Sequence, residues 1–277
     1  MIKILVDSSS DIMNERLVND NITMVPLRIQ IADDTYLDRK DLDANRFYEI
    51  LQTTKEFPKT SQPSPQDYVE IFEQAKANND TLLCIMLSSK LSGTFQSALL
   101  AKSIVEYDNI HIVDSLSISF GIELLVNQAK KMIEEVKTIY EIVSSLDELK
   151  TKIRIYASVE TLDYLCMGGR IDKKSAMIGN LAKIKPIISV IDGKVEVIAK
   201  AIGNIKAMNL IVKQSELYPV NPKHKVGAIY TSGFKNVDKL CAKLNDAQVH
   251  IDQKVQLGPV VGSHIGSEAF GYIYICK

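Results

Sequence analysis

The chain has 277 residues, of which 46% are hydrophobic and 24% are charged, and its net charge is −1. This length favours two domains, and the composition is that of a globular protein with a large core. The near-zero charge gives no basis for binding nucleic acid or an anionic membrane, and no apolar stretch approaches the roughly 20 residues that span a bilayer.

The first half of the chain alternates strand and helix patterns. β-Branched and apolar runs predict strands at residues 2–6, 22–31, 81–87 and 110–114. Helical spacing predicts helices at residues 44–52, 65–78, from the low nineties to 105, 117–135 and 139–149. Ser64, Pro65 and Asp67 form a capping pattern that sets the start of the second of these helices. Repeated alternation of this kind predicts a parallel sheet that is covered by helices on both faces.

The second half has a different pattern. Asp192 and Gly193 lie between two alternating runs, which is a strong signal for a two-residue hairpin. Strands are predicted at residues 154–158, 186–191, 194–199, 226–231, 249–257 and 271–276, and helices at 161–168, 173–184, 204–218 and 237–244. A hairpin among strand–helix units predicts a mixed sheet. We therefore expect an α/β protein with a parallel-sheet domain at residues 1–150 and a mixed-sheet domain at residues 151–277.

The cysteines, the histidines and the N-terminus indicate the compartment. No cysteine pair has C-x-x-C spacing and each cysteine has apolar neighbours, which is typical of buried free thiols in a reducing compartment. The four histidines show no metal-ligand spacing. The apolar run at residues 2–6 is much shorter than the hydrophobic region of a secretory signal. We therefore predict a cytoplasmic protein with no metal, no cofactor and no stable membrane insertion.

Three segments are unusually rich in small hydroxyl residues and glycine, at residues 60–64, 88–94 and 258–266. The second follows a predicted buried strand and opens a helix, where open α/β sheets bind ligands. A helix start also supplies free N–H groups and the positive end of the helix dipole. Residues of these types are first of all helix caps, so one such segment alone would indicate capping. The three together, with His264 in the third, predict an anion site built from neutral donors.

Catalysis has little support in the sequence. There is no G-x-x-x-x-G-K-[ST] nucleotide loop and no G-x-S-x-G nucleophile elbow. Ser92 and His264 could still form a catalytic pair on another fold, so a small-molecule hydrolase or transferase is an alternative, and a lipid-sensing regulatory module is a third. The glycines at 168 and 169 could end a helix in left-handed geometry. Arg170 beside them would then be either a surface charge or an anion contact.

Several of these segments are also motifs that occur in a fixed order. They are VDSSSD at 6–11, KTSQPS at 59–64, SSKLSGTFQSA at 88–98, VDS at 113–115, LDYL at 162–165, GGRI at 168–171, KPI at 185–187 and GSHIG at 262–266. With these motifs in this order, the whole chain resembles the DegV family of bacterial fatty-acid-binding proteins, which includes the fatty-acid-binding subunits of fatty acid kinase.

The resemblance implies two α/β domains with one long-chain fatty acid, such as palmitate, buried between them. It places carboxylate contacts at Thr60, Ser61, Ser92 and His264, with the backbone near Gly93 and Thr94 close by. It also places Arg170 near the mouth of the site. In kinase-linked members the protein presents the acyl carboxylate to a separate ATP-binding subunit, which makes acyl phosphate. The resemblance thus implies a non-catalytic carrier in lipid metabolism, whose partners are a long-chain fatty acid and a fatty acid kinase subunit.

Two positions depart from the family pattern. Family arginines after the hairpin are replaced in a stretch that contains Ile202 and Asn204. The chain therefore either docks to its kinase differently or binds lipid without serving one. The family's glycine-proline-glycine after the histidine loop is replaced by Gly266, Ser267 and Glu268. This replacement is expected to alter the loop locally and to leave His264 in place.

Overall fold

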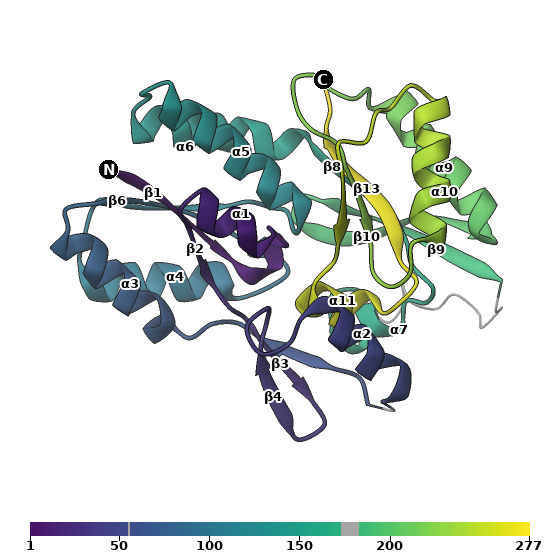
Figure 1. The fold of residues 1–277 in the computed structure, drawn as a ribbon, viewed down its shortest axis with the longest axis horizontal. Helices are drawn as coiled ribbons and strands as arrows, with labels where there is room; N and C mark the ends of the chain where they lie inside the picture. The colour runs from purple at the N-terminus through teal and green to yellow at the C-terminus, as the bar shows by residue number, and fades with distance from the viewer. Residues whose placement is uncertain (55, 173–182) are drawn as a thin grey trace.

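The computed structural model describes residues 1–54, 56–172 and 183–277, which form three β-sheets with helices packed on them (Figure 1). The first sheet is entirely parallel, as predicted. Its strands, in spatial order, are β2 (Ile22–Val25), β1 (Ile2–Asp7), β6 (Thr81–Met86) and β7 (Ile110–Asp114). Five of the six residues of β6 are buried, because helices cover both faces of this sheet.

Alternate side chains of these strands face two different apolar layers. Leu5 and Cys84 pack with Tyr68 and Phe72 of α3, whereas Ile4 and Leu83 belong to the core that continues into the rest of the molecule. The helices around this sheet are α1 (Asn14–Asn19), α3 (Pro65–Ala77), α4 (Thr94–Val105), α5 (Phe120–Glu134) and α6 (Ile139–Leu149), with short 3-10 helices at Ser8–Ser10 and Lys150–Lys152. The predicted capping box at the start of α3 is confirmed.

The second sheet is mixed, as predicted. Its strands, in spatial order, are β10 (Lys194–Ile202), β9 (Ile184–Ile191), β8 (Ile153–Ser158), β13 (Phe270–Ile275), β11 (Gly227–Tyr230) and β12 (Gln253–Gln256). Asp192 and Gly193 both have positive φ and connect β9 to β10, which confirms the hairpin. Helices α9 (Asn204–Leu217) and α10 (Lys235–Asp246) cover one face of this sheet (Figure 1). Its other face contributes to the core shared with the first sheet.

The prediction of one strand at residues 22–31 is wrong, because two strands form there and Pro26 and Leu27 separate them. Proline has no N–H for a sheet ladder and fixes its own φ, so β2 ends before it. The next residues form β3 (Arg28–Ile31), which pairs antiparallel with both β4 (Asp34–Leu37) and β5 (Lys59–Ser61). This three-stranded sheet was not predicted, and α2 (Ala44–Thr53) connects two of its strands.

Other expected elements need smaller corrections. The strand predicted at 249–257 is limited to β12, and the helix predicted from residue 117 begins at Phe120. The segment 258–266 is not a loop, because it contains α11 (Pro259–Ile265) with proline in its first turn. A short helix, α7 (Asp163–Met167), confirms the helix expected at 161–168. The helix predicted at 173–184 falls on residues outside those described, apart from the last two, and Ile184 begins β9.

The two larger sheets lie on either side of residue 150, but one apolar core cluster contains residues of both. The division into two domains at residue 150 therefore stays a prediction. All four cysteines are free, and Cys84 and Cys276 are buried while the other two are partly buried. In the described part of the chain no helix has the length and apolar character needed to cross a membrane.

Candidate functional site

A cavity lies between the two larger sheets. The parallel sheet contributes residues from the loops that follow its strands, and the mixed sheet contributes inward-facing residues of five strands. Most of the lining side chains are apolar: Leu27, Leu87, Leu91, Ile118, Ile155, Ala157, Leu165, Ile188, Val190, Val195, Ile229, Leu257, Val260, Val261, Ile265 and Ile273. The remaining lining residues are Thr60, Ser92, Ser119, Arg170 and His264.

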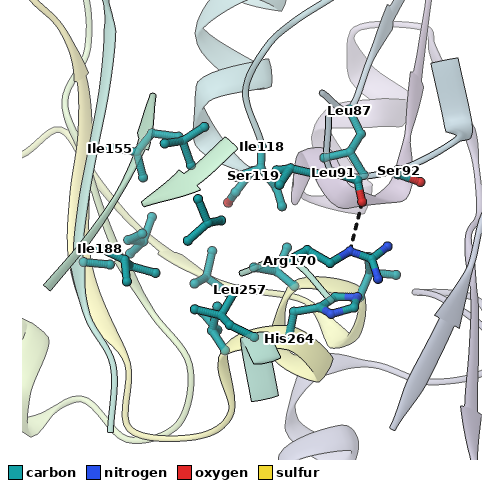
Figure 2. A pocket seen from close by; sticks show the side chains of 18 of the residues that line it. Leu87, Leu91, Ser92, Ile118, Ser119, Ile155, Arg170, Ile188, Leu257 and His264 are labelled. Atoms are coloured by element: carbon teal, nitrogen blue, oxygen red, sulfur yellow. Dashed lines mark hydrogen bonds between the residues drawn. The ribbon is translucent and has the colours of Figure 1, made fainter. Parts of the chain in front are cut away.

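The polar residues are not spread evenly around this cavity. Figure 2 shows Ser92, Arg170 and His264 gathered at one end, whereas Ile155 and Ile188 lie at the other. The cavity is thus mostly apolar, with two hydrogen-bonding residues and one cation gathered at one end and Ser119 apart from them. A site of this shape suits an elongated amphipathic ligand with a polar head.

Thr60 and His264 meet at the polar end, although 204 positions separate them in the chain. Thr60 Oγ1 lies 2.8 Å from His264 Nε2, and His264 Nδ1 has no hydrogen-bond partner within the described residues. Burial, with the positive charge of Arg170 nearby, lowers the pKa of His264 to about 3. The imidazole is therefore neutral near pH 7, with one nitrogen as donor and the other as acceptor.

The loop after α7 fits closely around the imidazole. A Cβ at Gly168 would lie 2.2 Å from His264 Nδ1, so only glycine leaves room for the ring. Gly169 has φ +70 and ends the helix in the predicted left-handed geometry. Arg170 Nε donates to the Leu91 carbonyl oxygen at 3.0 Å (Figure 2). Its Nη1 donates to the Gly168 carbonyl oxygen. Arg170 therefore lies at the cavity with its donors on backbone oxygens.

The loop before α4 provides the hydroxyls of Ser92 and Thr94, whose oxygens are 2.8 Å apart. The Thr94 amide also donates to Ser92 Oγ at 3.3 Å. Gly93 is the N-cap residue, and a Cβ there would collide with the side chain of Gln62 at 2.0 Å. Thr94 thus contacts Ser92, whereas neither Thr94 nor Gly93 lines the cavity itself, so their part in ligand binding stays a prediction.

Ser61 is another predicted residue that does not line the cavity, in addition to Gly93 and Thr94. It is exposed, because Thr60 and Ser61 are neighbours in β5 and point to opposite faces of that strand. Its contact with a carboxylate stays a prediction.

The DSSSD segment at residues 7–11 positions the two loops that carry the polar end. Asp7 Oδ2 accepts from the Leu87 amide at 2.7 Å, at the start of the loop that leads to Ser92. Asp11 Oδ1 accepts from the Gly258 amide at 2.9 Å, at the N-terminus of the helix that carries His264. Both aspartates are buried. They therefore act as anchors of the site rather than as parts of its lining.

Asp38 lies beside these anchors and is fully buried. Burial raises the pKa of Asp38 to about 8 and that of Asp11 to about 6. The folded protein keeps the Asp38 proton up to about pH 8, whereas an unfolded aspartate loses it near pH 4. The folded state thus binds more protons in this window, and the free energy of unfolding falls as the pH rises through it.

We expect Asp38→Asn to reduce this dependence on pH. Between pH 6 and 8 the slope of unfolding free energy against pH should become less negative by up to about 1.4 kcal/mol per pH unit, the value for one proton. Urea unfolding at several pH values in this interval measures the slope. Asp33→Asn, at an exposed position, is the control and should leave the slope unchanged. Equal slopes in the wild type and Asp38→Asn would show that Asp38 is ionised throughout.

Sequence reasoning missed Ser119, which lines the cavity from the loop between β7 and α5. Its amide donates to the Ser9 carbonyl oxygen at 2.8 Å, and its φ is +55. A serine in this region of φ is uncommon, and composition does not reveal it. The helical nature of residues 259–265 was also missed, although Pro259 after Gly258 is a recognisable helix start.

Fold and cavity together define an α/β protein that holds a ligand between a parallel and a mixed sheet. The family model described as "Uncharacterised protein, DegV family" matches residues 1–277. A DegV domain-containing protein of Caldanaerobacter subterraneus subsp. tengcongensis is 33% identical over 275 residues, covering 99% of this chain and 98% of its own length. The chain therefore belongs to the DegV family.

Two solved structures show what relatives bind. One is of a DegV family protein from Thermus thermophilus and is described by its fatty acid binding; its TM-score is 0.90 at 28% identity, with 100% of this chain and 99% of that chain covered. The other is a stearic-acid-binding protein from Eubacterium ventriosum, with a TM-score of 0.90, 28% identity and the same coverage.

Proposed function

We propose that this protein binds one long-chain fatty acid in the cavity between its sheets and carries it in the cytoplasm without transforming it. The carboxylate lies at the end formed by Thr60, Ser92 and His264, and the acyl chain extends toward Ile155 and Ile188. The observation that carries this proposal is the distribution of the lining, apolar along its length and polar at one end. The fatty acids bound by the Thermus and Eubacterium relatives support it.

Burial of the acyl chain supplies the affinity. Each buried methylene contributes about 0.8 kcal/mol, so about 15 of them contribute ~12 kcal/mol before the entropic cost of binding. An unpaired carboxylate in such a cavity would be very unfavourable. The hydroxyls of Thr60 and Ser92, with an N–H of His264, offset this by charge-assisted hydrogen bonds. Neutral donors of this kind hold the carboxylate while leaving it free to react with a partner.

The hydrogen bonds at the polar end favour binding over hydrolysis. His264 Nε2 pairs with Thr60, and Ser92 Oγ pairs with Thr94, so each member of the alternative catalytic pair is engaged elsewhere. A serine nucleophile needs a histidine that accepts its proton near neutral pH. Burial holds the pKa of His264 at about 3, which makes it a weak base.

The fate of the carboxylate is the second part of the proposal. We propose that a separate kinase subunit phosphorylates it, as in kinase-linked members of the family. Arg170 also lines an open groove outside the cavity together with Lys90, Lys194 and Lys200, so this face offers several cations to such a subunit. Ile202 is 63% exposed at the end of β10, so one family arginine position presents an apolar side chain instead. Docking would therefore rely on the groove more than on this position.

The first test is the ligand itself. We expect the purified protein to carry about one fatty acid per chain, identified by organic extraction and mass spectrometry. Delipidated protein should be stabilised by added palmitate or oleate, because a ligand at 100 times its dissociation constant adds about 2.7 kcal/mol. Hexadecanol, which has the sixteen-carbon chain of palmitate without the carboxylate, is the control and should stabilise the protein less.

Two results would contradict the proposal. One is the absence of acyl lipid together with no thermal stabilisation by either fatty acid. The other is steady turnover of an acyl ester by this chain alone that disappears in Ser92→Ala, which would favour the hydrolase alternative.

A further inference from the structure

The mixed sheet is open between two of its central strands. β8 and β9 pair only from Tyr156 opposite Ser189 to Ser158 opposite Ile187. β8 nevertheless continues back to Ile153 and stays paired with β13 on its other side. β9 continues forward and stays paired with β10 up to the hairpin. The two strands therefore separate beyond Tyr156 and Ser189, although each is still a strand.

Beyond this separation, the hairpin between β9 and β10 contacts the loop that follows β6. Ser88 Oγ donates to the Gly193 carbonyl oxygen at 2.8 Å, and this hydrogen bond is buried. A Cβ at Gly193 would lie 2.5 Å from Ser88 Oγ, so the turn sits directly on the loop after β6. The tip of the hairpin is thus attached to the loop after β6 of the parallel sheet, while the end of β9 lies apart from β8.

A second cavity lies at this opening. Its lining includes polar groups from both sides of the gap, among them Arg154, Tyr156, Ser189, Gln214 and Tyr218. Arg154 lies over the Tyr218 ring at 5.0 Å and donates to two backbone oxygens, so its charge is fixed at this cavity.

Two residues line both the first cavity and the second, namely Ile155 of β8 and Val190 of β9. They face each other across the strand separation, one residue beyond the last pair of the ladder. Figure 2 places Ile155 at the end of the first cavity that is opposite Ser92 and His264. These two side chains are therefore the partition between an apolar cavity and a polar one.

We propose that Ile155 and Val190 form the end wall of the acyl site and set the longest chain that it accepts. This inference rests on the proposed function, because it assumes that the carboxylate occupies the polar end. An acyl chain that reaches the wall gains from every methylene it buries. A longer chain must displace the wall or place its terminal carbons beside Arg154 and Ser189, where burial beside polar groups is not favoured. Affinity should therefore rise with chain length and then fall.

The test measures affinity for saturated fatty acids from laurate to behenate in steps of two carbons, by displacement of a fluorescent fatty acid. In Ile155→Ala and Val190→Ala the wall is shortened, and each methylene newly buried should raise affinity about fourfold. We expect the preferred length to increase by two carbons or more. The affinity for the longest chains relative to palmitate should increase about tenfold.

Ile229→Ala and Val260→Ala are the matched controls, because these residues line the first cavity but not the second. They should lower affinity for all lengths and leave the preferred length unchanged. Val190→Phe enlarges the wall and should shift the preference to shorter chains, which tests the proposal independently if an alanine variant fails to fold. Thermal unfolding checks the fold of each variant.

The outcomes separate the two proposals. The wall proposal alone is overturned if the wild type binds fatty acids but the wall variants keep its preferred length, or shift it no more than the controls do. A wild-type protein that binds no fatty acid of the series overturns the proposed function and the wall with it.

Discussion

Replacing Gly168 with alanine is expected to weaken fatty acid binding about ten- to a hundredfold. The new Cβ would lie 2.2 Å from His264 Nδ1, so the imidazole has to leave its present position beside Thr60. Loss of one hydrogen bond to a buried carboxylate costs about 1.5–3 kcal/mol, which corresponds to this range of affinity. Isothermal titration of delipidated protein with palmitate measures the change.

Gly169→Ala is the matched control, one residue along the same loop. Gly169 has φ +70, and a Cβ there would meet nothing within 4 Å. Its replacement should cost about 1–2 kcal/mol of stability through backbone strain and leave the affinity for palmitate nearly unchanged. Equal losses of affinity in the two variants would mean that the loop, and not the imidazole, determines binding.

Ser92→Ala should also weaken fatty acid binding about ten- to a hundredfold, whereas Arg170→Ala should change it much less. Ser92 offers its hydroxyl at the polar end of the cavity, and alanine leaves the carboxylate with one donor fewer. The donors Nε and Nη1 of Arg170 are engaged by backbone oxygens, and the residue also lines the outer groove. Arg170→Ala should instead slow acyl phosphate formation in a coupled assay with the kinase subunit of the same organism.

Ser89→Ala is the control for the serine, because Ser89 belongs to the same loop but does not line the cavity. It should bind palmitate as the wild type does. If Arg170→Ala abolishes binding while Ser92→Ala leaves it intact, the carboxylate lies elsewhere and the assignment of the polar end is wrong.

The sequence was informative wherever a short segment determines its own structure. The capping box of Ser64 and Asp67, the Asp192–Gly193 turn and the buried strand β6 each have local signals, and each is confirmed. The three-stranded sheet depends instead on pairing of β3 with β5, across about thirty residues of chain. A pattern of alternating residues does not identify such a partner, so residues 22–31 were predicted as one strand.

For the candidate site, too, the sequence predicted some features and not others. The sequence motifs identified Thr60, Ser92, Arg170 and His264, and the structure places all four around one cavity. Orientation was harder to predict, because it depends on which residues form a strand. Ser61 faces outward because it follows Thr60 in β5, and this strand was not predicted. The end of the cavity also lies where β8 and β9 separate, beside a hairpin that is bonded to a distant loop, and sequence patterns do not reveal such a separation.

Because the cavity lies between the sheets, ligand exchange is linked to the strength of the contact between the two halves of the molecule. The cavity walls come from the core cluster that contains residues of both halves, so a bound acyl chain adds apolar contacts to each half at once. An unoccupied apolar space at this place weakens the contact between the halves more than it weakens either sheet, since sheet hydrogen bonds are unaffected. The contact between the two halves at this junction is then weakest in the protein without a ligand. In the proposed complex the acyl chain adds contacts across this junction, so we expect that loading itself slows release.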